Sequence, residues 1–213
     1  MADLSLMQFR KEYLSGELLE KDLLEDPHLQ FQEWLEDAIR SGIDDPNAMS
    51  LATASSNGMP SVRIVLLKDA RPEGLVFLTN YNSRKGNELE DNPYAAALFF
   101  WPGLERQVRI EGNISKLSAE ESDRFFNARP PKSRIAAIIS EQSSIIPGRT
   151  FIEEKFNSYD SGAENMILRP VYWGGYLLQP VSYEFWQGRE NRLHDRLRYS
   201  FKENSWKIER LAP

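Results

Sequence analysis

The sequence predicts a mainly β protein with peripheral helices, in which the strands form a closed or nearly closed antiparallel barrel. Short β-rich runs bounded by turn residues begin at Met49 and continue almost to the C-terminus. Few helical patterns separate these runs, which favours an antiparallel barrel over a parallel, doubly wound sheet. We expect a single domain over residues 1–213, with an N-terminal helical segment, residues 1–42, that packs on the barrel.

The first clear element is a helix over residues 26–42. Asp26 can cap its start, Pro27 suits its first turn and Gly42 can end it. Four apolar residues recur at helical spacing and share one face: Phe31, Trp34, Leu35 and Ile39. We interpret this face as a packing surface.

The remaining elements follow from β-rich runs, turn residues and capping patterns. We expect strands over residues 49–55, 62–68, 75–79, 94–101, 107–117, 172–178, 182–187, 197–201 and 205–211. We expect helices from Ser83 to before Pro93, from Ser118 to about Ala128, around 134–140 and near 150–159.

Local signals support several of these elements. Asn57-Gly58 predicts a tight turn that makes a hairpin of the first two strands. Ser118 and Glu121 have the spacing of a capping box. Gly112, inside a strand, indicates a bulge or a close backbone approach.

Composition excludes several classes of function. The chain has no cysteine and only two histidines, His28 and His194, so we expect no metal site and no thiolate chemistry. Its net charge of -6 disfavours binding to nucleic acid or to an anionic membrane. We find no membrane-spanning run and no signal peptide, and therefore expect a cytoplasmic protein.

Basic residues are nevertheless grouped, which predicts local binding of anions such as phosphate esters. The groups are Arg63 with Lys68, Arg84 with Lys85, Arg129 with Lys132, and Arg192 with Arg196 and Arg198. Any one group alone is more often a solvated face than a binding site. Ser83 strengthens the second group, because a capping serine and two cations meet at a helix N-terminus.

Side-chain alternation on the strand 63–68 puts Arg63, Val65 and Leu67 on one face and Lys68 on the other. The same alternation in an extended 192–196 segment would bring Arg192, His194 and Arg196 to one side, where they could meet an anionic aromatic ligand.

Two further segments have polar or aromatic groups suited to a planar ligand. The segment Gln142-Ser143-Ser144 offers amide and hydroxyl groups that suit the imide edge of a flavin, or it is simply a polar loop. Trp186 suits a planar cofactor or fills core.

Taken together, these segments resemble the pyridoxine (pyridoxamine) 5'-phosphate oxidase family over nearly the whole chain, from Phe9 to Pro213. The motifs that carry the resemblance are residues 63–68, Ser83-Arg84-Lys85, 104–107, Arg129-Pro130, 142–144, Trp173-Gly174-Gly175, 185–188 and 192–196. The resemblance implies an FMN-binding split barrel and a homodimer with the flavin at the subunit interface.

The resemblance also implies site residues. The implied flavin contacts are Arg63, Ile64, Val65, Leu66, Leu67, Lys68, Leu78, Thr79, Ser83, Arg84, Lys85, Gln107, Gln142, Ser143, Trp186 and Arg196. The implied substrate contacts are Lys68, Phe125, Arg129, Ser133, Arg192 and His194, with Arg10 and Tyr13 on an N-terminal lid. Phe125 stands where the family has a tyrosine that bonds the substrate phosphate, and Leu78 replaces an aromatic residue near the flavin.

The implied activity is oxidation of pyridoxine 5'-phosphate or pyridoxamine 5'-phosphate to pyridoxal 5'-phosphate, with O2 as acceptor and release of peroxide. Arg192 and His194 are the candidates for orienting the substrate and assisting proton removal. Two alternatives stay open: a split-barrel flavin oxidase of another substrate, as in phenazine synthesis, and a non-catalytic protein that binds flavin or pyridoxal phosphate.

Overall fold

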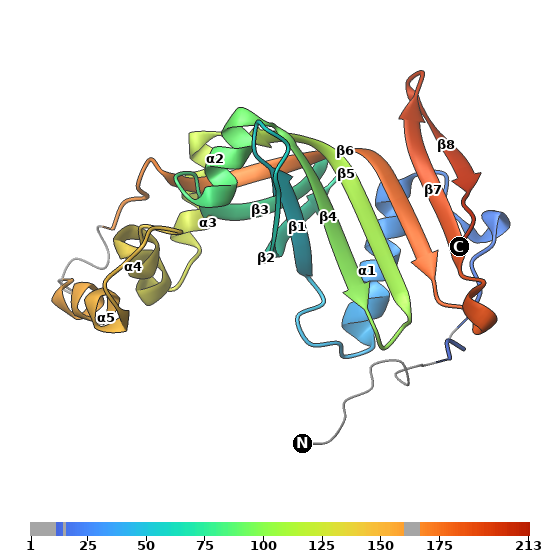
Figure 1. The fold of residues 1–213 in the computed structure, drawn as a ribbon, viewed down its shortest axis with the longest axis horizontal. Helices are drawn as coiled ribbons and strands as arrows, with labels where there is room; N and C mark the ends of the chain where they lie inside the picture. The colour runs from blue at the N-terminus through green and yellow to red at the C-terminus, as the bar shows by residue number, and fades with distance from the viewer. Residues whose placement is uncertain (1–11, 15, 160–166) are drawn as a thin grey trace. The chain divides into compact units, whose positions relative to one another are not determined.

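The computed structural model describes residues 12–14, 16–159 and 167–213 (Figure 1). Its strands are β1 (Ala48–Ala54), β2 (Pro60–Arg71), β3 (Gly74–Asn80), β4 (Tyr94–Trp101), β5 (Arg106–Lys116), β6 (Trp173–Gln187), β7 (Asp195–Lys202) and β8 (Ser205–Arg210). Its helices are α1 (Pro27–Arg40), α2 (Arg84–Asp91), α3 (Ala119–Asn127), α4 (Pro131–Ile139) and α5 (Arg149–Ser158), with short 3-10 turns η2 (Glu20–Asp22) and η4 (Glu190–Arg192).

The sheet confirms the predicted antiparallel barrel. Hydrogen-bonded neighbours run in the order β3-β2-β1-β4-β5-β6-β7-β8, and β3 also pairs with β6. The first six strands therefore close on themselves, and β7 and β8 extend the sheet beyond β6. The hairpin is confirmed as well, since β1 and β2 pair from Ala48 opposite Leu66 to Ala54 opposite Pro60.

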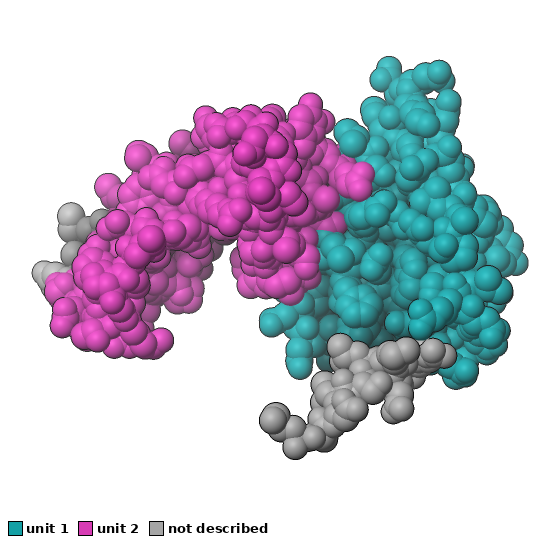
Figure 2. All heavy atoms as spheres, viewed as in Figure 1, with its two compact units in different colours: residues 1–47, 98–110, 181–213 teal, residues 48–97, 111–180 magenta. Residues whose placement is uncertain are grey.

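The chain divides into two compact units (Figure 2). Unit 1 contains residues 1–47, 98–110 and 181–213, and unit 2 contains residues 48–97 and 111–180. The strands β4, β5 and β6 each continue from one unit into the other. The single domain, with residues 1–42 packing on the barrel, stays a prediction.

The core of unit 1 is aromatic. Phe31 and Trp34 of α1 pack against Phe99 and Phe185, with ring centroids 5.0 and 5.1 Å apart. Asp26 caps α1 by accepting the His28 amide, as predicted. The predicted apolar face is wrong at Ile39, which is 57% exposed, because Ala38 takes the buried position in the last turn.

The core of unit 2 lies inside β1, β3 and β4 and includes Leu51, Val76, Phe77 and Ala97. The predicted strands 172–178 and 182–187 are one continuous strand, β6, so that boundary was wrong. The first part of β6 pairs with β3 through Leu178, and the second pairs with β7 from Ser182 onward. Pro180 lies at the change of partner, where no backbone N–H is needed for either ladder.

Gly112 of β5 makes the close approach expected of it. A Cβ at this position would overlap the Gln179 carbonyl oxygen. No helix among the described residues is long and apolar enough to cross a membrane.

Candidate functional site

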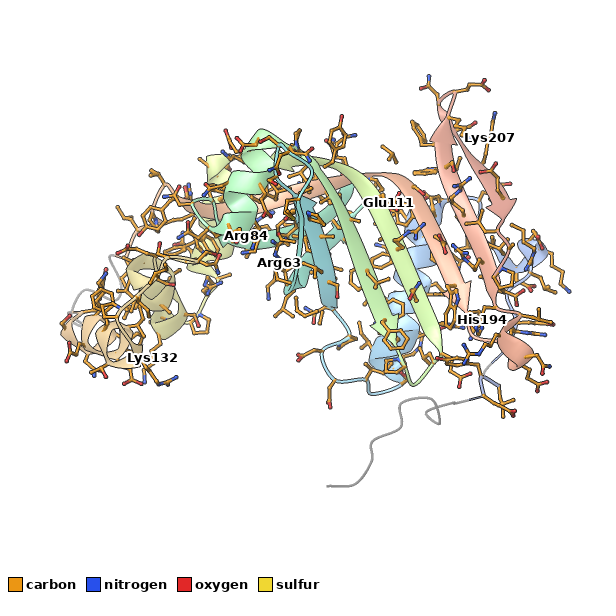
Figure 3. All side chains as sticks on the ribbon, in the orientation of Figure 1. Arg63, Arg84, Glu111, Lys132, His194 and Lys207 are labelled. Carbon is orange, nitrogen blue, oxygen red and sulfur yellow. The ribbon has the colours of Figure 1, made fainter. Side chains whose placement is uncertain are left out.

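A cavity of about 520 Å³ in unit 2 brings Arg63 of β2 together with Arg84 and Lys85 of α2, whereas Lys68, the other predicted cation of β2, is not part of its lining. Its lining includes nine of the predicted cofactor residues: Arg63, Ile64, Val65, Leu78, Thr79, Arg84, Lys85, Gln142 and Ser143. Arg63 comes from β2 and Arg84 from the start of α2 (Figure 3). The lining also includes Gln142, so residues that are distant in the chain meet at one surface.

Ser83 fixes the start of α2 as predicted. Its hydroxyl accepts the Gly86 amide and donates to the Asn80 carbonyl oxygen at 2.6 Å. Ser83 is fully buried and lies behind the cavity lining. The cap therefore holds Arg84 and Lys85 at the helix N-terminus, where backbone amides also favour an anion.

Lys85 is the most deeply buried cation of this group. Its ammonium donates to Thr79 Oγ1 and Gln142 Oε1, both at 3.0 Å. Burial, assisted by the positive charge of Arg63, lowers the pKa of Lys85 to about 8, although Glu88 acts in the opposite direction. The ammonium also donates to Ser83 Oγ at 3.4 Å. A bound phosphate would supply the negative charge that these neutral acceptors lack.

A second cavity, of about 820 Å³, also lies in unit 2 and shares Leu78, Thr79 and Gln142 with the first. Arg129 lines it and stacks on Trp173, with its guanidinium carbon 5.1 Å from the ring centroid. The Arg129 Nε is buried with no hydrogen-bond partner among the described residues, and burial lowers the pKa of this side chain. An unsatisfied buried donor on a cation suits an anionic ligand.

A separate cluster in unit 1 surrounds Trp186. Its ring lies 4.7 Å from the His194 ring and 5.6 Å from that of Tyr13. Across the β6–β7 ladder, Trp186 is opposite Arg196. The structure thus brings together four of the predicted residues in this unit.

His194 is held in a defined protonation state. Its Nδ1 accepts the backbone N–H of Arg189 at 3.1 Å, so the neutral ring carries its proton on Nε2. Burial, with the nearby charge of Arg192, lowers the pKa of His194 and favours this neutral form. Nε2 is therefore a hydrogen-bond donor, which argues against a role as proton acceptor through that atom.

The predicted extended conformation of residues 192–196 is wrong. Glu190–Arg192 form the turn η4, and Asn191 and Arg192 both have positive φ, 55° and 61°. β7 begins only at Asp195. His194 and Arg196 are both neighbours of Trp186, and this shared neighbour, rather than strand alternation, brings them together. Arg192 lies in a left-handed turn, a backbone conformation that is energetically costly for residues other than glycine.

The remaining predicted site residues that the structure describes line neither of these two cavities. Leu67 is buried, while Leu66 and Lys68 are exposed on β2, and the β2–β3 register shifts between Leu67 and Asp69. Ser133 accepts Arg129 Nη2 through its backbone oxygen at 3.3 Å. Phe125 packs beside Val76, Leu117 and Leu177, Gln107 is half-buried on β5, and Arg10 lies outside the described residues.

Sequence reasoning missed the buried carboxylates of Glu88 and Glu184, which pair with predicted site residues. Glu88 accepts Arg84 Nε at 2.9 Å and Arg63 Nη2 at 3.2 Å. Glu184 accepts Arg196 Nε at 2.8 Å and forms an ion pair with Arg109 at 2.7 Å. The four-residue spacing from Arg84 to Glu88 on a helix was a usable signal for Glu88, whereas no local sequence pattern marks Glu184.

The fold and these cation-lined cavities define a split-barrel protein suited to anionic ligands. Residues 35–160 match the pyridoxamine 5'-phosphate oxidase family, and residues 173–213 match the C-terminal dimerisation region of pyridoxine 5'-phosphate oxidase. The chain therefore belongs to the pyridoxamine 5'-phosphate oxidase family. The match to a dimerisation region supports a homodimer.

Individual proteins agree with this assignment. A pyridoxine/pyridoxamine 5'-phosphate oxidase of Herminiimonas arsenicoxydans is 47% identical over 99% of this chain and 100% of its own. PhzG of Burkholderia lata, solved in complex with tetrahydrophenazine-1-carboxylic acid, is 30% identical with a TM-score of 0.86, over 94% of this chain and 100% of its own. A pyridoxamine 5'-phosphate oxidase-related, FMN-binding protein of Nostoc punctiforme shares the fold, with a TM-score of 0.73 at 17% identity over 90% of this chain and 100% of its own.

Proposed function

We propose that this protein is an FMN-dependent oxidase that converts pyridoxine 5'-phosphate and pyridoxamine 5'-phosphate to pyridoxal 5'-phosphate. It uses O2 as acceptor, releases hydrogen peroxide, and works in the cytoplasm as a homodimer with the flavin site at the subunit interface. The observation that carries the proposal is the pair of cavities sharing Leu78, Thr79 and Gln142. The first is lined by the cations Arg63, Arg84 and Lys85, and the second by Arg129. Cofactor and substrate each have one phosphate, so two cation groups are required.

The residues present fit FMN. Arg63, Arg84 and Lys85 would hold its phosphate, and Gln142 and Ser143 offer hydrogen-bonding groups for the polar edge of the ring. Trp186 and Arg196, which belong to unit 1, would add an aromatic face and a further cation. When bound, FMN supplies two-electron redox chemistry, and molecular oxygen is the final acceptor.

The protein's own task is to hold and orient the substrate. Arg129, with Lys68 and Ser133, would bind the substrate phosphate, and the unpartnered Arg129 Nε supports this role. Arg192 and His194 would orient the pyridine ring, His194 by donating from Nε2. Tyr13 would lie on an N-terminal lid. Phe125 supplies no donor to a phosphate, so Arg129 would carry more of the binding energy.

Exposed aliphatic side chains support the interfacial position of the flavin. Val62 and Ile64 are 68% and 65% exposed and line the first cavity. Adjacent apolar surface of this kind fits coverage by a second copy of the chain.

The test is peroxide release by the purified, FMN-loaded protein on addition of pyridoxine 5'-phosphate or pyridoxamine 5'-phosphate. We expect turnover of both, and little turnover of unphosphorylated pyridoxine, because Arg129 would have no anion to bind. An Arg129→Gln variant should raise KM for the phosphorylated substrates while leaving flavin content unchanged.

The same assay separates the two alternatives. Turnover of a reduced phenazine carboxylic acid, without turnover of the vitamers, would support an oxidase of PhzG type. This chain is 30% identical to PhzG and 47% identical to the H. arsenicoxydans oxidase, which favours the B6 vitamers as its substrates. Bound flavin with no peroxide from any of these compounds would support a binding protein instead.

A further inference from the structure

We propose that Glu88 is a positioning residue for the phosphate end of the flavin site, and that it sets the preference for FMN over riboflavin. The inference rests on the proposed function, because it assumes that the cavity of Arg63, Arg84 and Lys85 binds the flavin phosphate. It concerns a residue behind the cavity: Glu88 does not line it, whereas all three cations do.

Glu88 is almost fully enclosed by donors from three elements. Its Oε2 accepts Thr53 Oγ1 of β1 at 2.5 Å, and Ser61 Oγ and Arg63 Nη2 of β2 at 2.6 and 3.2 Å. Its Oε1 accepts Arg84 Nε of α2 at 2.9 Å. The side chain is 7% exposed. One carboxylate therefore joins the strand pair that holds Arg63 to the helix that holds Arg84.

The hydrogen bonds outweigh the cost of burying this charge. Burial alone would raise the pKa of Glu88, but donation from Ser61, Thr53, Arg84 and Arg63 lowers it to about 2. Glu88 is therefore ionised at neutral pH and keeps two guanidiniums close together despite their mutual repulsion.

The contacts leave the outward donors of Arg84 available. Glu88 occupies only its Nε, and the Arg84 side chain is 62% exposed on the cavity side of α2. Within the described ranges, no protein group bonds its two terminal nitrogens. Arg63 is held more tightly, because its Nη1 donates to Leu51 O at 3.1 Å and to Thr53 Oγ1 at 2.6 Å. Glu88 thus restricts one edge of the Arg84 fork and directs the other edge to a ligand.

Two physical effects of Glu88 have opposite signs, which makes the proposal testable. As a negative charge near a phosphate, Glu88 should weaken FMN binding. As a positioning group, Glu88 should strengthen FMN binding, because an Arg84 side chain that is already restrained loses less entropy on binding than an unrestrained one. We propose that positioning is the larger effect.

The experiment measures affinity of the flavin-free protein for FMN and for riboflavin by quenching of flavin fluorescence. Glu88→Gln should weaken FMN binding by about tenfold, the loss of roughly one charged hydrogen bond, and leave riboflavin binding nearly unchanged. Glu90→Gln is the matched control, since Glu90 is on the same helix and, among the residues that the structure describes, forms its ion pair with exposed Lys116. That control should change neither affinity.

A second variant, Glu88→Asp, separates the effect of the negative charge from the effect of side-chain length. It also provides the test if Glu88→Gln does not fold. It keeps the charge but shortens the side chain by one methylene, so it should also reduce the FMN affinity. Tighter FMN binding by Glu88→Gln, an unchanged FMN affinity in Glu88→Asp, or equal losses for FMN and riboflavin would each overturn the proposal. Failure of the wild-type protein to bind any flavin would instead contradict the proposed function.

Discussion

The Lys85 ammonium donates hydrogen bonds to neutral oxygens. Its pKa is lowered to about 8, mainly by burial. The unfolded chain would keep the value of 10.5. The unfolded state therefore binds more protons between these two values, and the ligand-free protein should gain stability as pH rises through this range. Phosphate binding has the opposite dependence, because it requires the charged ammonium.

We therefore expect the affinity for FMN to fall as pH rises above about 8, by up to roughly tenfold for each pH unit. Fluorescence titration between neutral and alkaline pH measures this directly. Lys85→Met should bind FMN weakly and with a flatter pH dependence. An unchanged affinity across this range in the wild-type protein would show that Lys85 does not hold the phosphate.

His194 provides a second test, of hydrogen-bond donation against proton acceptance. The bond from the Arg189 amide to Nδ1 leaves Nε2–H as the group free to meet a substrate. His194→Gln can place an amide N–H near that position, whereas His194→Ala cannot. The glutamine variant should retain a substantial part of the rate of flavin reduction, measured by stopped flow, and the alanine variant should lose about tenfold more. Equal losses would favour proton acceptance.

Elements with local signals were predicted well, and those that depend on distant partners were not. The Asn57-Gly58 turn and the Ser83 and Ser118 caps are short-range features, and the structure confirms each. Continuity of β6 through Pro180 depends on a change of partner from β3 to β7, which no local pattern encodes. The left-handed turn at Asn191 and Arg192 was missed because neither residue is glycine.

The same distinction applies to the candidate site. The motif order predicted that Arg63, Arg84, Lys85 and Gln142 belong together, and they line one cavity. Hydrophobic patterns could not identify Glu88, because a buried carboxylate looks like any surface residue in the sequence. Its burial depends on donors from β1 and β2 that meet α2 only in the folded barrel.

Helix α2 positions most of the cations, and Gly86 sets how closely it packs. A Cβ at Gly86 would overlap the Tyr81 carbonyl oxygen. Gly→Ala in a helix usually stabilises by about 0.5–1 kcal/mol, but here the helix must shift. Gly86→Ala should therefore lower the free energy of urea unfolding and weaken FMN binding.

Gly148→Ala is the control for this substitution. It precedes α5 with an extended backbone, and a Cβ there meets nothing within 4 Å. We expect little change in stability or flavin binding. A Gly86→Ala protein as stable as the wild type, with full flavin affinity, would show that the α2 packing is more tolerant than the geometry indicates.

At the scale of the whole molecule, a flavin site at the subunit interface would make FMN binding depend on formation of the dimer. Ile64 is exposed on β2 and lines the flavin cavity. Ile64→Lys should shift the protein from dimer to monomer in analytical ultracentrifugation and weaken FMN binding. Val171→Lys, at a residue 88% exposed that lines neither cavity, should do neither. A dimer with full flavin affinity in Ile64→Lys would place the interface elsewhere.

The most direct test of the oxidase assignment is a single turnover without oxygen. Pyridoxine 5'-phosphate is mixed anaerobically with the FMN-loaded protein, and loss of the oxidised flavin absorbance is followed together with aldehyde formation. We predict that the flavin is reduced and that one pyridoxal 5'-phosphate appears for each flavin. A flavin that stays oxidised while pyridoxine 5'-phosphate is demonstrably bound would contradict the assignment.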